Sequence, residues 1–254
     1  GDFECSLNKD VEYFFKEKAI EFSKQGIAET FIVTSSYKEK EVINNIRRIG
    51  GVDTGEILPI KGCREQYFYR NKMEFSFGDE YKDGPLSLGL HKKGSTYDVL
   101  TAHDCKLVHE DMTKILSCVL AYFKERNASY YKKMQHVGYL RHLLLRRGDI
   151  TGEILVNLVT TTQEEYDLAP LVEVLLGLEL EGKIVGILHI LNDSLSDVVQ
   201  SDETRILYGQ DFFYEKLLGL EFKVTPFSFF QPNSRAAEVL YSTVREYIGD
   251  IDNM

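Results

Sequence analysis

The spacing of apolar residues predicts helices in the first part of the chain. A helix is expected over residues 9–25, and a short β-prone run follows at residues 30–33. Ser36-x-x-Glu39 forms a capping box, in which two side chains satisfy backbone N–H groups of a first helical turn. This capping box predicts a second helix, which the pair Gly50-Gly51 ends.

The apolar period then changes from about 3.6 residues to 2, which is typical of strands. Residues 73–77, Met-Glu-Phe-Ser-Phe, alternate between apolar and polar side chains. The turn signal Asp83-Gly84-Pro85 follows, and further strands are expected over residues 86–90 and 97–100. Three strands joined by short turns predict an antiparallel meander. A helix is expected from about residue 109, where the apolar spacing is again helical.

The second half of the chain follows a similar plan. Strands are expected over residues 140–146, 154–159, 184–191, 204–208 and 220–224, and a helix over residues 164–178. This order is not a run of β–α–β units, because strands follow one another directly at several places. The predicted fold class is therefore α+β, a largely antiparallel sheet with packed helices.

Core building does not by itself explain the segment 225–234, Thr-Pro-Phe-Ser-Phe-Phe-Gln-Pro-Asn-Ser. It joins the strand at 220–224 to a stretch with helical spacing, and Asn233 or Ser234 is expected to cap that helix. The three phenylalanines could stack on a flat ring, and the Gln231 amide could both donate to and accept from a base edge. The alternative is an aromatic loop, bounded by prolines, that fills the core.

Composition and charge limit the kind of protein. The chain has 254 residues, of which 43% are hydrophobic and 28% charged, as in soluble globular proteins. No apolar run reaches the roughly 20 residues that span a bilayer, and no secretory signal is recognisable, so a cytoplasmic location without a membrane partner is expected. The net charge of −10 argues against a surface that binds any nucleic acid, but it allows a local basic groove.

The cysteines give no sign of a metal centre. They lie at positions 5, 63, 105 and 118 and form no closely spaced pair, so neither disulfides nor a zinc site are indicated. His103, Asp104 and Cys105 lie near His109, but a structural cysteine is favoured over a nucleophile that uses one of these histidines. Motifs for a Rossmann dinucleotide site, a P-loop and a zinc protease are absent.

Two basic stretches are candidates for contacts with nucleic-acid phosphates. Arg70 and Lys72 lie at a strand start beside Tyr67, Phe68 and Tyr69, whose rings could stack on bases. The alternative there is a solvated strand end next to core phenylalanines. The second cluster contains Arg141, His142, Arg146 and Arg147. It could face either phosphates or water, and its local charge density favours phosphates.

Several separated motifs together resemble the RNA uracil-5 methyltransferases, the RumA/TrmA family. They occur in the family's order: Ile46-Arg47-Arg48-Ile49-Gly50-Gly51, Tyr69-Arg70-Asn71-Lys72-Met73-Glu74-Phe75-Ser76-Phe77, Leu88-Gly89-Leu90-His91, Gly152-Glu153-Ile154-Leu155-Val156 and Ser228-Phe229-Phe230-Gln231-Pro232-Asn233-Ser234. The resemblance covers about residues 36–250 and does not explain residues 1–35.

In that family, S-adenosylmethionine supplies a methyl group to carbon 5 of an RNA uridine. A cysteine thiolate adds to carbon 6, and a carboxylate later removes the proton, which requires a flipped-out base and a thiol of low pKa. The resemblance implies that Phe229 and Gln231 lie where the target base and the cofactor meet. It also implies that Arg70 and Lys72 lie on the RNA-facing side. Ribosomal RNA is favoured as the partner, with transfer RNA as the other choice.

The chain departs from the family pattern in three ways. The glycine-rich cofactor loop, the nucleophilic cysteine and the base are expected beyond Met254, so no catalytic residue is assigned and the chain alone is expected to be inactive. Many members hold an iron–sulfur cluster, and Cys105 lies near the position of its fourth ligand. Residues 20–40 contain no cysteine, so neither a cluster nor another metal is expected. No N-terminal β-barrel RNA-binding domain is recognisable.

The resemblance divides the chain into four parts. Residues 1–35 are an N-terminal helical segment without assignment, and residues 36–66 are a helix and linker that would pack on the catalytic domain. Residues 67–226 form the central α+β, RNA-side domain, and residues 227–254 begin the methyltransferase domain. The Rossmann-like catalytic domain would be mostly absent, and the faces it leaves exposed would allow self-association. The alternative function is a non-enzymatic RNA-binding module.

Overall fold

The structure is a computed structural model that describes residues 47–51, 61, 65–95, 97–195 and 202–248. The chain divides into two units, Gly1–Arg64 and Glu65–Met254. In the first unit, residues 47–50 are helical, and Gly51 follows with φ +61, a left-handed conformation that glycine adopts without strain. The predicted end of the helix at Gly50-Gly51 is thus confirmed. The helix predicted over residues 9–25 and the run at 30–33 lie outside the described residues.

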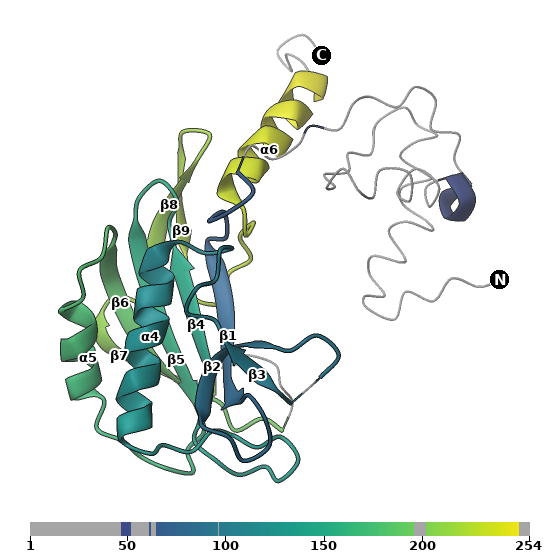
Figure 1. Cartoon of the computed structure of the whole chain (residues 1–254). Coiled ribbons are helices and arrows are strands. Elements are labelled where there is room, and N and C mark those ends of the chain that lie inside the picture. The colour runs from purple at the N-terminus through teal and green to yellow at the C-terminus, as the bar shows by residue number, and fades with distance from the viewer. Residues whose placement is uncertain (1–46, 52–60, 62–64, 96, 196–201, 249–254) are drawn as a thin grey trace. The chain divides into compact units, whose positions relative to one another are not determined.

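The second unit is built on a seven-stranded sheet with the order β3-β2-β1-β4-β5-β6-β7 (Figure 1). Its strands are β1 Lys72–Asp79, β2 Leu86–His91, β3 Val99–Thr101, β4 Leu140–Arg147, β5 Glu153–Thr160, β6 Lys183–Leu191 and β7 Glu203–Gly209. All neighbouring strands are antiparallel except β5 and β6, which are parallel. The predicted α+β class and largely antiparallel sheet are confirmed.

Two helices, α4 (Glu110–Glu125) and α5 (Ala169–Leu176), cover one face of this sheet (Figure 1). The α4 helix begins after His109, whose Nδ1 accepts a hydrogen bond of 3.1 Å from the backbone N–H of Asp111. The apolar residues that predicted this helix are all buried, namely Met112, Ile115, Leu116, Val119, Leu120 and Phe123. They pack on the alternate side chains of β1, Met73, Phe75 and Phe77, in one hydrophobic core.

The α5 helix begins later than its apolar spacing predicts. It was expected from residue 164, but it begins at Ala169 and ends at Leu176, before Gly177. Pro170 lies in its first turn. Proline lacks an N–H group and collides with the preceding turn, so it is tolerated at a helix start and not in the interior. The prediction over residues 164–178 was therefore wrong in its first turn.

A two-stranded sheet, β8 (Phe213–Leu217) and β9 (Leu220–Val224), adds to the other face of the large sheet. It contributes Phe213 and Val224 to a second core cluster, which also contains Leu155, Val159, Leu188 and Ile190. The strand β9 was predicted, whereas β8 was not. Because both faces of the large sheet are covered around β4, all eight residues of that strand are buried.

The helix α6 (Ser234–Ile248) follows the hairpin, after the segment 225–233. Asn233 caps it, since its Oδ1 accepts a hydrogen bond of 2.9 Å from the backbone N–H of Ala236. This satisfies one of the N–H groups that a first helical turn leaves without a partner. The predicted cap is confirmed. Within the described ranges, no helix combines the length and the apolar character needed to cross a membrane.

Candidate functional site

The segment 225–234, called here the aromatic loop, exposes two of its phenylalanines to different degrees and partly buries the third. Phe229 is 86% exposed and Phe227 is 46% exposed. Phe230 instead packs against the second core cluster, with its ring centroid 5.8 Å from that of Phe222. The core-filling interpretation therefore holds for Phe230 alone. An almost fully exposed aromatic ring on the same loop needs another explanation.

Arg146 holds one side of the aromatic loop through its backbone. Its Nε donates to the carbonyl oxygen of Pro226 at 2.9 Å, and its Nη2 donates to that of Ser228 at 2.6 Å. The side chain is 1% exposed, and burial lowers the pKa of its guanidinium to about 10. In the part of the chain that the structure describes, no carboxylate lies within ion-pair distance of it. The buried charge is compensated by two carbonyl dipoles of the loop.

Asn71 holds the other side of the aromatic loop. Its side-chain amide donates to the carbonyl oxygen of Gln231 at 2.7 Å and to Oγ of Ser234 at 2.9 Å. Its backbone N–H donates to the carbonyl oxygen of Pro232 at 2.8 Å. Ser234 in turn donates to the fully buried carboxylate of Glu215 at 3.1 Å. The start of β1 is thus joined to the end of the loop and to the hairpin.

The Gln231 side chain keeps its hydrogen-bonding capacity. The residue is half-buried, and the bond that it accepts from Asn71 uses its backbone carbonyl, not its side chain. Among the described residues, none makes a hydrogen bond to its side-chain amide. An amide carries both a donor and an acceptor, so Gln231 can offer both to a ligand beside Phe229.

Arg70 and Lys72 lie at the same end of β1, close to Arg146. Lys72 is the direct partner of Arg146 across the β1–β4 pairing, and Nε of Arg70 donates to the Lys72 carbonyl at 3.2 Å. Burial, and next the charge of Arg146, lowers the pKa of the Lys72 ammonium group. Three cationic side chains therefore gather beside the loop, in a chain whose net charge is −10. An anion placed there would relieve their mutual repulsion.

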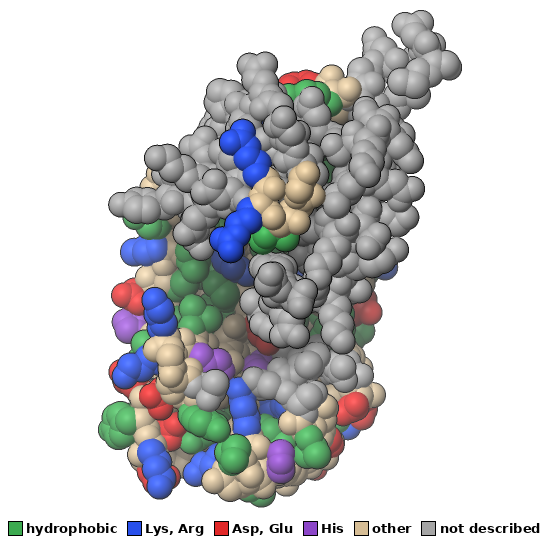
Figure 2. Space-filling model, turned by 90° about the vertical axis from the view of Figure 1, so that its right-hand side faces the viewer, with side chains coloured by type: hydrophobic (Ala, Val, Ile, Leu, Met, Phe, Trp, Pro, Cys, Tyr) green, Lys and Arg blue, Asp and Glu red, His purple; other side chains and the backbone are tan. Residues whose placement is uncertain are grey.

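The described residues beside β1 to β3 carry side chains of mixed character. Figure 2 shows that Lys and Arg side chains are interspersed with acidic, hydrophobic and histidine side chains on the face beside β1 to β3. Over the described residues of that face, no continuous basic area is present.

The cluster of basic residues on β4 does not face phosphates. Arg141, His142, Arg146 and Arg147 are all buried, at 3%, 3%, 1% and 7% exposure, so the prediction of a phosphate-facing edge was wrong. The reason is that β4 lies in the middle of the sheet and is covered on both faces. Arg147 is ion-paired with Asp111 at 3.0 Å, and Arg141 donates to the carbonyl oxygens of Asn192 and Ser194.

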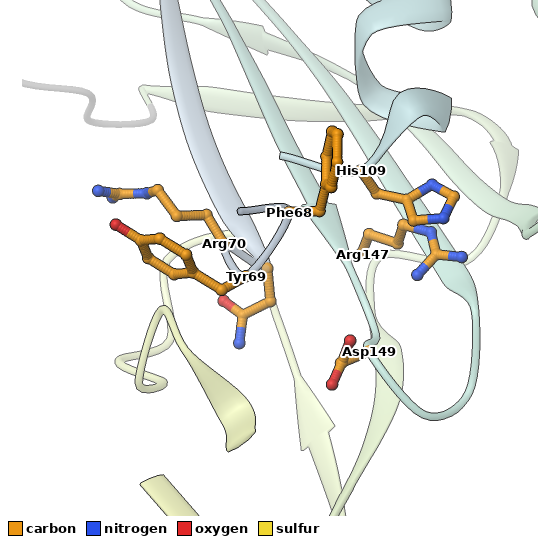
Figure 3. A pocket seen from close by; sticks show the side chains of 7 residues that line it. Phe68, Tyr69, Arg70, His109, Arg147 and Asp149 are labelled. Atoms are coloured by element: carbon orange, nitrogen blue, oxygen red, sulfur yellow. The ribbon is translucent and has the colours of Figure 1, made fainter. Parts of the chain in front are cut away.

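A shallow pocket lies between the start of β1 and the start of α4 (Figure 3). Its lining residues are Phe68, Tyr69, Arg70, Asn71, His109, Arg147 and Asp149. Tyr69 and Arg70 point to one side in this view, and His109 and Arg147 lie on the other (Figure 3). His109 caps α4 and Arg147 is paired with Asp111, so both groups are used in holding the fold.

The structure describes two of the four cysteines. Cys105 and Cys118 are half-buried and pack against the helix-side core. Burial raises the pKa of the Cys118 thiol, which disfavours the reactive thiolate. The described residues contain no group of three or more His, Cys, Asp or Glu side chains that could hold a metal ion.

The sequence of this chain is similar to those of RNA methyltransferases. No family model matches the chain. An uncharacterised RNA methyltransferase of Clostridium tetani is 49% identical over 213 residues, which are 84% of this chain and 46% of that protein. One from Clostridium acetobutylicum is 46% identical over 217 residues, which are 85% of this chain and 47% of that protein. The chain is homologous to these RNA methyltransferases. It spans about half the length of the curated relatives it matches.

A solved structure shares the fold. The tRNA (uracil-54, C5)-methyltransferase of Pyrococcus abyssi, in complex with S-adenosyl-L-homocysteine, matches with a TM-score of 0.64 and 23% identity. The match covers 84% of this chain and 48% of that protein. At 23% identity, this similarity shows a shared fold and no more.

Sequence reasoning did not identify Arg146 and Asn71 as the residues that hold the aromatic loop. A signal was present in the strand period. Alternation along β4 puts Arg146 on the face opposite Arg147, so one of the two arginines had to point away from α4. Asn71 lies within the motif at residues 69–77. A side-chain amide can bind many kinds of donor and acceptor, so its partner could not be predicted from the sequence.

Proposed function

We propose that this chain forms the RNA-facing part of an enzyme that transfers a methyl group to carbon 5 of a uridine in structured RNA. Ribosomal RNA is favoured as the substrate, and transfer RNA is the other candidate. The observation that carries the proposal is the exposed Phe229 ring on a loop that is fixed at both ends, in a chain homologous to RNA methyltransferases. An exposed aromatic ring on a loop whose backbone is held by hydrogen bonds is suited to stacking on an unpaired base.

Each candidate residue has a role that matches its surroundings. Phe229 would stack on the target uracil, and the Gln231 amide would bond to the edge of the base and to the cofactor. Arg70 and Lys72 would contact phosphates that flank the target nucleotide. Such contacts position the RNA without reading its sequence. These four residues come from the start of β1 and from the aromatic loop, which Asn71 joins by direct hydrogen bonds.

S-adenosylmethionine would supply the methyl group when bound. Within this chain, Gln231 offers it one polar contact, because the side-chain amide is not used elsewhere among the described residues. We assign no catalytic residue in the chain. Cys105 and Cys118 pack against the core, so neither is positioned as the nucleophile that attacks the uracil ring. We further propose that residues 67–226 are the RNA-side domain, and that residues 36–66 and 227–254 belong with the methyltransferase domain.

The test is a methylation assay on the complete gene product. The protein is incubated with S-adenosylmethionine and unmodified ribosomal or transfer RNA, and 5-methyluridine is measured by mass spectrometry of nucleosides. Phe229→Ala is expected to lower kcat/KM at least about tenfold, as for the loss of one stacked base. Phe227→Ala is the matched control, since it removes a less exposed ring from the same loop.

Two outcomes count against the enzyme. If RNA binds and no methylated nucleoside forms, the chain is part of a non-enzymatic RNA-binding protein. If methylation occurs at another atom or base, the assignment to carbon 5 of uridine is wrong. Equal activity of the two alanine variants would remove Phe229 from the site.

A further inference from the structure

We infer that Arg146 is a positioning residue, which fixes the aromatic loop so that Phe229 is held in place before RNA arrives. The inference rests on the proposed function only for its RNA-binding consequence. The geometric part rests on the two hydrogen bonds from the buried guanidinium to the carbonyl oxygens of Pro226 and Ser228.

A guanidinium group suits this task better than other side chains. Its planar fork carries several N–H donors in fixed directions, so it can bind two carbonyl oxygens at once. The two carbonyls belong to residues on either side of Phe227, and the second directly precedes Phe229. A lysine keeps the charge but lacks the fork, and a methionine of similar length keeps only the apolar stem.

The buried charge of Arg146 raises the energetic cost of moving the loop. Arg146 is 1% exposed, and no carboxylate of the described residues is paired with it. A buried cation without partners is costly, so movement of the loop would remove the carbonyl groups that compensate the guanidinium. The lowered pKa of Arg146 agrees with a site in which desolvation is the main effect.

Contacts around Phe229 restrict its neighbours and leave its own side chain in solvent. Thr225 and Ser228 are joined through their hydroxyl groups at 2.6 Å, which closes the turn on the N-terminal side. Phe230 packs against Phe222, and Asn71 binds the carbonyl oxygens of Gln231 and Pro232. A residue on a fixed backbone loses less backbone freedom on binding than one on a mobile loop, so affinity improves without any new contact.

The experiment uses the absence of tryptophan from the chain. Phe229→Trp places a single fluorescent reporter at the tip of the loop in the 254-residue chain. Time-resolved anisotropy then measures local motion of residue 229 in the wild-type background and with Arg146→Met, Arg146→Lys or Arg147→Lys. Arg147 is the matched control, because it is the adjacent buried arginine but binds Asp111 on the helix side. Circular dichroism confirms that each variant is folded at the temperature used.

The expected result is a larger amplitude of fast motion at residue 229 in both Arg146 variants, with Met exceeding Lys, and no change in Arg147→Lys. The same amplitude in Arg146→Lys and Arg147→Lys would overturn the inference. If Arg146→Met does not fold, the comparison of the two lysine variants decides.

A second measurement tests the consequence for RNA, with Phe229 intact. Arg146→Met is expected to weaken RNA binding about tenfold, because the loop must be ordered on binding, while Arg147→Lys binds as the wild type does. Unchanged RNA affinity in Arg146→Met would overturn the positioning role. If the wild-type chain binds no RNA, the proposed function fails, and the anisotropy data still decide whether Arg146 fixes the loop.

Discussion

Asn71 and Ser234 are 163 positions apart in the chain, yet Nδ2 of Asn71 donates a hydrogen bond of 2.9 Å to Oγ of Ser234. The bond joins the start of β1 to the first residue of α6. Both side chains are buried, and Ser234 passes the connection on to Glu215 in β8. The position of the aromatic loop therefore depends on contacts between residues that are far apart in the sequence, and such contacts cannot be read from local sequence patterns.

Replacement of Asn71 by alanine is expected to lower the free energy of unfolding by about 1–3 kcal/mol, because Gln231 and Ser234 lose a buried partner. Urea denaturation measures the change. Ser117→Ala is the control, since its exposed hydroxyl donates only to a carbonyl of its own helix, and it is expected to have a much smaller effect. Equal losses for the two variants would show that the Asn71 contacts do not stabilise the fold.

The ion pair between Asp111 and Arg147 connects α4 to β4, and its loss is expected to be costly. The Asp111 carboxylate is 1% exposed and also accepts hydrogen bonds from the N–H groups of Glu181 and Gly182. Although burial alone would raise its pKa, these bonds and Arg147 hold the pKa below the usual value. Asp111→Asn is expected to destabilise by about 3–5 kcal/mol, since the buried guanidinium of Arg147 loses its buried counter-ion and keeps only the exposed carboxylate of Glu181 nearby.

A double-mutant cycle checks the cause of that loss. Asp111→Asn combined with Arg147→Met is expected to cost less than the sum of the two single changes. Glu181→Gln is the control, because that carboxylate is largely exposed and is expected to contribute at most about 1 kcal/mol. Simple additivity of the two core changes would contradict the account.

His189 is expected to reduce stability at acid pH. Burial, and next the charge of Arg205, lowers the pKa of its imidazole to about 4, while Glu203 acts in the opposite direction. The unfolded chain takes up this proton near pH 6.5, so between pH 6.5 and 4 the unfolded state binds more protons. Protonation of this histidine therefore costs no stability above pH 6.5. As the pH falls, the free energy of unfolding decreases by about 3 kcal/mol in total.

Thermal or urea unfolding between pH 4 and 7 tests this linkage. His189→Asn is expected to show a flatter dependence of stability on pH over that interval, and His103→Asn, an exposed control, is expected to follow the wild type. Parallel curves for His189→Asn and the wild type would show that this histidine does not cause the acid loss.

The turn between β8 and β9 contains a strained leucine. Leu218 has φ +50 and Gly219 has φ +79, so both central residues of this two-residue turn adopt left-handed conformations. Asparagine and glycine are preferred at such positions. Leu218→Asn is therefore expected to stabilise the protein by up to about 1 kcal/mol, measured as a higher denaturation midpoint. A lower midpoint would mean that the leucine side chain contributes more packing than its backbone costs.

Much of the fold follows from local patterns in the sequence. The period of two at residues 73–77 predicted β1 and its buried face, and the helical spacing after residue 109 predicted α4 with its six core positions. These elements each bury one face against the core, so their periodicity is preserved. The strand β8 was missed because its turn, Leu218-Gly219, lacks the asparagine or aspartate that usually marks a hairpin.

The candidate site was less predictable, for a physical reason. A charged residue in a strand indicates either a solvated face or a buried group with specific partners, and the sequence does not show which layers cover the strand. Arg146 was expected at a phosphate-facing edge, but β4 is central and Arg146 binds loop carbonyls 80 and 82 positions away. Phe229 was assigned from resemblance, and the assignment of Phe229, Gln231, Arg70 and Lys72 to RNA contacts stays a prediction.

Photocrosslinking tests the central claim most directly. RNA that carries 4-thiouridine at the methylated position is bound to the complete gene product and irradiated, and the crosslinked peptide is identified by mass spectrometry. The account predicts that the crosslink maps to the peptide containing Phe229, and that Arg146→Met reduces its yield. Efficient crosslinking confined to segments outside residues 225–234, with RNA affinity intact, would contradict it.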